Sequence, residues 1–367
     1  MKRFVIVMLL GLCFVQYLIQ PHAYAAQMFS DRQTQGQADM RRTLDGESRM
    51  VLDAISDGED LTQSISQILR QTKQQQRGAI AEAVAALTGA AAVMLLCSCA
   101  EAFSKTSRIS PLILQLAGAL GMTAAVYQTL AGLTSLCRET TEQIQIFSKS
   151  MLPVMTTAIG LSGSPASAAL VYSGTMFALD LCISLITGVY IPAVSAYVAI
   201  LTVNTAIGND MLKRLAACVK WLITGSLRLL LTLFFFYITI SGSVSHGMDA
   251  GTVKAAKFAL NSSVPLVGNI LSGATDSVLA GAVVLKNSLG VFGMLCICAI
   301  CLVPFLRIGV NYLAFKIGAA VLSPICPKLL SGLADGIADS IGMIFGMLGS
   351  CSAILFFELV YSVVMVT

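Results

Sequence analysis

The chain has 367 residues, of which 56% are hydrophobic and 11% are charged. Soluble domains carry roughly 25% charged residues, so this composition excludes a soluble globular protein. The net charge of +4 comes without a basic patch interleaved with aromatic side chains, which argues against a nucleic-acid partner. Only His22 and His246 are histidines, and the eleven cysteines lie mostly in apolar runs. We therefore expect neither a metal nor another cofactor, and we interpret the cysteines as packing residues.

Residues 1–25 have the pattern of a secretory signal peptide. Lys2 and Arg3 precede an apolar stretch, and Ala23-Tyr24-Ala25 supplies the small residues of a cleavage site. An uncleaved first anchor is the alternative interpretation. In both cases the chain from residue 26 onward begins outside the cytoplasm.

Residues 26–78 form a polar segment. Leu61, Ile65 and Ile68 recur at helical spacing, which predicts one or two amphipathic helices on the extracytoplasmic face. This segment is either a solvated lead-in to the membrane or a docking surface for an extracytoplasmic partner.

The rest of the chain, residues 79–367, is predicted to be an all-α transmembrane domain. Spanning segments are predicted over residues 79–100, 112–136, 166–188, 192–207, 221–242, 289–304, 306–325 and 341–366. Residues 137–150 combine charges with an apolar side, which is typical of an interfacial helix. A polar loop containing Asp335 and Asp339 is predicted to begin at Cys326.

Two apolar segments, 151–174 and 262–287, are rich in residues that interrupt helices. A broken backbone at membrane depth survives only where protein or a wet cavity satisfies its polar groups. Paired interruptions of this kind are typical of transport sites, so both segments are predicted to be interrupted or re-entrant hairpins. The expected breaks are at Pro153, Gly163, Pro165, Pro265, Gly268 and Gly273.

A weak internal repeat relates the two hairpins. Tyr127 and Thr129 correspond to Tyr237 and Thr239 at a shift of 110 residues. These matches predict units over about 112–218 and 219–340, with a partial third over 341–367. The matches are few, so coincidence is the alternative.

The basic loops 101–110 and 208–220 both belong in the cytoplasm by the positive-inside rule. An even number of crossings between them would make the repeat units parallel, which we favour. An odd number would make them inverted.

Charged residues at membrane depth are the candidate functional residues. A charge facing lipid at the bilayer centre costs about 2.5–3.5 kcal/mol or more, so such groups pair, reach an interface or line a polar path. The candidate polar seam consists of Arg228, Asp276, Lys286, Asp180 and Glu358. Ion pairing and snorkelling that hold the bundle together are the structural alternative. No nucleophile–base set or phosphate-binding motif is visible, so we do not expect an enzyme.

The order of these features resembles a known family. A leader, a polar segment, the span SLRLLLTLFFFYITISG and the stretch from Pro265 to Gly293 resemble stage III sporulation protein AE of endospore-forming Firmicutes. The resemblance implies a polytopic protein of the outer forespore membrane, made in the mother cell. It also implies, as partners, the other subunits of the same complex and a forespore-side partner across the intermembrane space. The family supplies no catalytic residues to carry over.

Three functions are consistent with these features. The first is a membrane core subunit of a trans-envelope channel complex, permease-like, whose hairpins line a path. The second is a non-conducting scaffold that recruits partners through residues 26–78. The third is an independent secondary transporter.

Overall fold

The computed structural model describes residues 38, 41–44, 46, 49, 81, 84–101, 111–161, 165–263 and 268–364. This part of the chain is almost entirely helical and contains no strand, which confirms the predicted all-α membrane fold. The predicted signal peptide, residues 1–25, and most of the predicted polar segment 26–78 lie outside the described residues.

Six helices within the described ranges are long and apolar enough to cross a membrane. The first covers Val84–Glu101. The others are built from α4 (Pro111–Leu161), α5 (Pro165–Leu185) joined through a π-helical turn (Ile186–Tyr190) to α6 (Ile191–Ile207), α7 (Asp210–Ser263), α8 (Gly268–Leu322) and α9 (Lys328–Val364). The long helices α4, α7 and α8 have 51, 54 and 55 residues. At 1.5 Å per residue each is about 75–85 Å long, far more than a bilayer core of roughly 30 Å requires.

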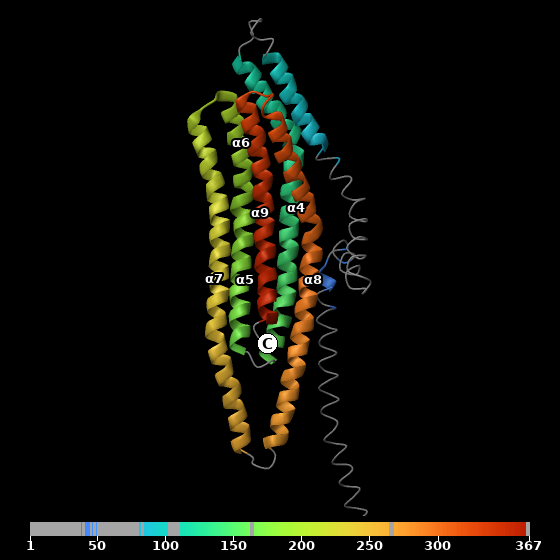
Figure 1. Ribbon diagram of the computed structural model, residues 1–367, viewed down its shortest axis with the longest axis vertical. Helices are drawn as coiled ribbons and strands as arrows, with labels where there is room; N and C mark the ends of the chain where they lie inside the picture. The colour runs from blue at the N-terminus through green and yellow to red at the C-terminus, as the bar shows by residue number, and fades with distance from the viewer. Residues whose placement is uncertain are drawn as a thin grey trace, which may run out of the picture.

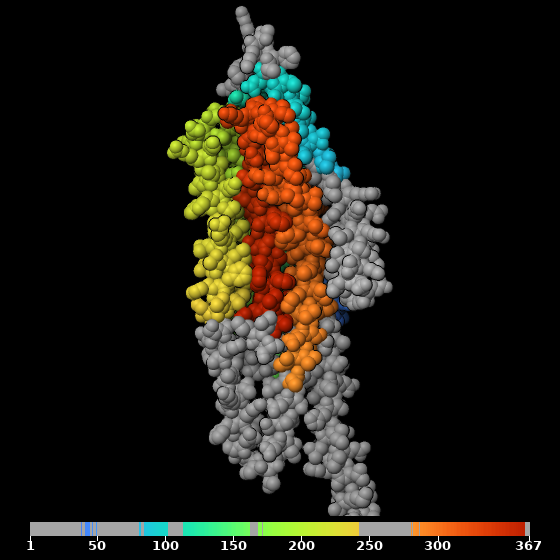
Figure 2. All heavy atoms as spheres, viewed as in Figure 1, coloured from blue at the N-terminus to red at the C-terminus, as the bar shows by residue number. Residues whose placement is uncertain are grey.

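Helix α9 is the centre of the bundle. It packs against α4, α5, α6, α7 and α8, and it is the most buried of the six candidate spans. The core beside it is apolar and includes Phe147, Met151, Ile344 and Leu355. On the face shown in Figure 2, α9 lies between α7 and α8. The interior of the helical bundle around α9 is therefore filled by hydrophobic side chains.

A two-residue turn joins α6 to α7. Gly208 ends α6 with φ of 71°, a left-handed conformation that glycine adopts at little cost, and its N–H donates to the carbonyl of Asn204. Asn209 then begins α7, because its Oδ1 accepts from the N–H of Met211 at 2.9 Å. Figure 1 shows this turn and the start of α4 at the same end of the bundle. Two helical crossings separate them, which is the even number that the charge bias favours.

Several predicted boundaries are wrong because the helices are longer than the hydropathy suggests. Residues 137–150 are not a separate interfacial helix but the middle of α4. The predicted polar loop beyond Lys328 is the first part of α9, and it carries Asp335 and Asp339. Charges end a hydropathy window, yet they do not end a helix whose backbone hydrogen bonds are satisfied internally.

The expected hairpin breaks have different outcomes. Helix α4 continues through Pro153, and α8 continues from Gly268 through Gly273, so neither Pro153 nor Gly273 interrupts the backbone. Pro165 and Gly268 begin helices, whereas Gly163 and Pro265 lie outside the described residues. Neighbouring helices and side-chain hydroxyls can replace the hydrogen bond that an intramembrane proline removes. The tandem repeat and any re-entrant segment stay predictions.

A short part of the polar segment contacts the bundle. Leu44 is buried, and the guanidinium of Arg41 lies 5.9 Å from the centre of the Phe292 ring on α8. Cations are attracted to aromatic faces at this range. The described fragment of the N-terminal segment therefore packs against α8.

Candidate site between α7 and α9

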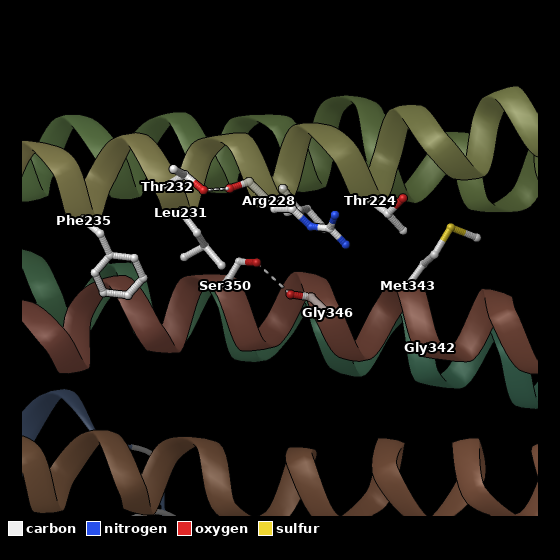
Figure 3. Close-up of a pocket in the computed structure, with 10 residues that line it drawn as sticks. Thr224, Arg228, Leu231, Thr232, Phe235, Gly342, Met343, Gly346 and Ser350 are labelled. Atoms are coloured by element: carbon white, nitrogen blue, oxygen red, sulfur yellow. Dashed lines mark hydrogen bonds between the residues drawn. The ribbon is translucent and has the colours of Figure 1, made fainter.

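A pocket of about 380 Å³ lies between α7 and α9 (Figure 3). Its residues from α7 are Thr224, Leu227, Arg228, Leu231, Thr232 and Phe235, and those from α9 are Gly342, Met343, Gly346 and Ser350. Both helices belong to candidate membrane spans. The pocket therefore places a guanidinium group within a candidate membrane span.

Small residues on α9 create the pocket. Gly342, Gly346 and Ser350 recur every four residues and so lie on one face of the helix. A Cβ atom added at Gly346 would meet no heavy atom within 4 Å. Faces of this kind let membrane helices approach closely. Here no residue of the described chain fills the space over Gly346.

Two contacts close the ends of the pocket. At one end Lys220 of α7 and Asp339 of α9 form an ion pair of 2.6 Å. At the other, the Phe235 and Phe357 rings pack edge to face with centroids 4.8 Å apart. These contacts hold α7 against α9 on both sides of Arg228.

Arg228 is exposed, and within the described residues its guanidinium has no ion pair. Its backbone carbonyl accepts from the hydroxyl of Thr232 at 2.8 Å. Ser350 bonds its own helix through the carbonyl of Gly346. A neutralising group for the Arg228 side chain must therefore come from outside the described chain, because an unpaired cation at membrane depth is costly.

The predicted polar seam is not gathered in one place. Lys286 and Asp276 belong to the first part of α8, and at a rise of 1.5 Å per helical residue they are about 25–40 Å from Arg228 along the bundle axis. Asp180 lies on the outer side of α5, where its Oδ1 accepts from Gln145 of α4 at 3.0 Å. Asp180 and Arg228 are therefore on different surfaces.

Glu358 is the predicted seam residue that lies in the core. Its exposure is 1%. One carboxyl oxygen accepts from the Ser362 hydroxyl at 3.0 Å, and the other has no hydrogen-bond partner among the described residues. Buried intramembrane carboxyl groups are often functional, so this residue remains a candidate.

The sequence analysis missed a charged cluster that joins three helices. Lys316 of α8 contacts Asp335 at 3.3 Å and Asp339 at 3.4 Å, and Asp339 also binds Lys220. The two aspartates are four residues apart, a spacing that places them on one helix face. The four-residue spacing of Asp335 and Asp339 could have indicated a shared charged face. It does so only if the segment is helical, and the sequence analysis had predicted a loop there.

Comparison with known proteins supports one family. The family model for stage III sporulation protein AE matches residues 48–367, nearly the whole chain. The chain belongs to the stage III sporulation protein AE family. This result confirms the resemblance inferred from the leader, the spans and the Pro265–Gly293 stretch. It establishes a sporulation-family, multi-pass membrane protein.

A curated member of the stage III sporulation protein AE family comes from Bacillus subtilis (strain 168). It is 29% identical over 224 residues, which are 60% of this chain and 56% of that protein. The chain thus aligns with little more than half the length of this relative. A comparison with solved structures finds no match.

Proposed function

We propose that this chain is a membrane core subunit of the sporulation complex that joins the mother cell and the forespore. Its place would be the outer forespore membrane, with other subunits of the complex and a forespore-side protein as partners. Family membership supports a role in stage III sporulation. The apolar core around α9 favours a passage between subunits over one through a single bundle.

The observation that carries this proposal is the pocket around Arg228. It combines an exposed cation without an ion pair among the described residues and an uncovered glycine, Gly346, both within candidate membrane spans. A membrane helix from another subunit that presents an acidic or polar side chain would satisfy both. Helix packing over small residues and a charge-assisted hydrogen bond to Arg228 would then hold the two subunits together.

The test uses Gly346→Leu, whose Cβ atom meets no heavy atom of the described chain within 4 Å, and Arg228→Ala, which removes the charge. The matched control is Leu229→Ala, because Leu229 is 60% exposed on the same helix outside the pocket. Both pocket variants should lower the count of heat-resistant spores and the recovery of co-purified membrane partners. We expect a loss of about tenfold in partner recovery, the change that a tenfold higher Kd would produce at limiting partner concentration.

Protein levels must be equal in all strains for this comparison. Normal sporulation with intact partner recovery in both pocket variants would rule out the pocket as a partner site. An equal loss in the Leu229→Ala strain would show a general packing effect.

A second candidate function, an independent secondary transporter, is favoured by one observation. Glu358 is a buried intramembrane carboxyl group with one oxygen left without a hydrogen bond. Proton and ion relays in transporters use such groups.

A further inference from the structure

The outer face of α4 is polar over residues 127–149, although it lies within a candidate membrane span. Nine side chains in this stretch are exposed, and six of them are polar or charged. These six, which we call the α4 stripe, are Gln128, Ser135, Arg138, Glu139, Glu142 and Lys149. From first to last the stripe is about 32 Å long, close to the roughly 30 Å thickness of the hydrocarbon core.

The bundle cannot hide this stripe by rotating α4. The opposite side of the helix is already in the core, where Cys137, Thr141 and Ile144 are each 0% exposed. Any turn of α4 that buried the stripe would bring these residues out. The stripe therefore faces away from α9.

Other helices show what a lipid-facing surface of this protein looks like at the same level. Cys137 of α4 reaches the carbonyl of Ile344 on α9 at 3.8 Å, and the neighbouring Gly346 shares a pocket with Arg228 of α7. At that level α7 exposes Leu229 and Leu233, at 60% and 57%. One side of the bundle is thus apolar where the α4 side is charged.

The charges of the stripe are not neutralised within the described part of the chain. Arg138, Glu139, Glu142 and Lys149 form no ion pair there. Charged side chains at membrane depth are rarely left against acyl chains. Another protein surface of matching charge is needed at this position.

We propose that copies of this chain contact one another through the α4 stripe, Arg138 of one copy against Glu139 of the next. The two residues are adjacent, so they differ by about 1.5 Å in height and 100° around the helix. Arg138 and Glu139 therefore lie at nearly the same position along the membrane normal, on opposite edges of the α4 stripe. A rotation about the membrane normal does not change that position, so it can bring Arg138 of one copy to Glu139 of the next. A repeated contact of this kind, between two different edges of each copy, closes into a ring.

The α4 stripe is a different surface from the α7–α9 pocket. A result against contact between copies at the stripe would therefore leave the proposed partner site at the pocket unaffected, and the reverse also holds. The stripe lies on the outer side of α4, and the pocket is lined only by α7 and α9. A ring of copies would leave the pocket free for a different subunit.

The first arm of the test measures proximity between copies. Ser135→Cys and, as control, Leu229→Cys are each placed in a full-length chain whose exposed Cys99, Cys218 and Cys298 are changed to alanine. A bis-maleimide that reaches about one helix diameter, roughly 10 Å, is then added to membranes. We expect covalent dimers and larger species from Ser135→Cys and only monomer from Leu229→Cys. Equal products from both positions, or monomer from Ser135→Cys, would overturn the proposal.

The second arm tests the charge pair in two differently tagged, co-expressed copies. Arg138→Glu or Glu139→Arg alone should lower co-purification of the second tag about tenfold, because like charges then meet. The double variant Arg138→Glu with Glu139→Arg restores opposite charges and should recover within about twofold of the native chain. Failure of the double variant to exceed the single variants would refute this pairing even if the copies associate.

Discussion

Glu358 is the residue at which the membrane core departs most from simple hydrophobic packing. It is fully enclosed on α9, next to Leu359, whose side chain reaches Gly293 of α8. Its hydrogen bond to Ser362 lies within one turn of the same helix and leaves one oxygen without a partner. Either the carboxyl group is part of the packing, or it takes part in transport.

Glu358→Gln separates these two roles, because glutamine keeps the shape and can still accept the Ser362 hydrogen bond. For a subunit that works through its outer surfaces we expect normal sporulation and an unchanged midpoint of thermal unfolding in detergent. Glu358→Ala, the control, should lose about 2–4 kcal/mol of stability through the cavity it creates. Loss of spores in the Gln variant at normal protein level would favour the transporter.

Single residues also show what the sequence could and could not predict. The membrane depth of Arg228 followed from its apolar neighbours Leu227 and Leu229, because hydropathy is a property of adjacent residues. Its pocket did not, because Gly346 is opposite Arg228 only after α7 and α9 have packed. Contacts between residues more than 100 positions apart leave no trace in one sequence.

At the scale of helices, α5 and α7 pack closely because Gly174 has no side chain. The Tyr237 hydroxyl of α7 donates to the carbonyl of Leu170 at 2.7 Å, and its ring covers the Cα of Gly174. A Cβ atom at residue 174 would overlap the Tyr237 ring. This glycine is needed for a close approach between two helices.

Gly174→Ala should destabilise the bundle, because the Tyr237 ring must move and lose its hydrogen bond. We expect a loss of about 1–3 kcal/mol, measured by thermal unfolding of the purified protein in detergent. Gly188→Ala is the control, since a Cβ atom there meets nothing within 4 Å. The control should be neutral or stabilising, and a larger loss at residue 188 than at 174 would contradict this packing.

Helix type could be predicted from the sequence, but helix length could not. The apolar runs correctly indicated helices able to span a membrane, but the predicted spans 289–304 and 306–325 are parts of one helix, α8, and 166–188 and 192–207 form one candidate span. Pro153 and the charges of residues 137–150 suggested boundaries inside α4 that do not exist. Hydropathy reports where a side chain prefers to be, whereas a helix continues wherever its backbone hydrogen bonds are kept, in membrane or in water.

At the scale of the whole molecule, several of the described ionisable groups within candidate membrane spans lie on outer surfaces. Arg228 is on the α7–α9 face and the α4 stripe is on another, while the core around α9 is apolar. Leu229 and Leu233 show that the same bundle also has a surface suited to lipid. This arrangement is what we expect if other membrane proteins cover these faces, as we propose.

The most direct test of whether the α7–α9 pocket binds another membrane protein is photo-crosslinking in sporulating cells. A benzophenone amino acid replaces Leu231, which lines the pocket, or Leu233, which is exposed on the same helix outside it. We predict discrete adducts with another membrane protein from position 231 and none from position 233, because lipid covers the latter. Absence of protein adducts at 231, or the same adducts from both positions, would contradict the claim that the pocket binds a partner.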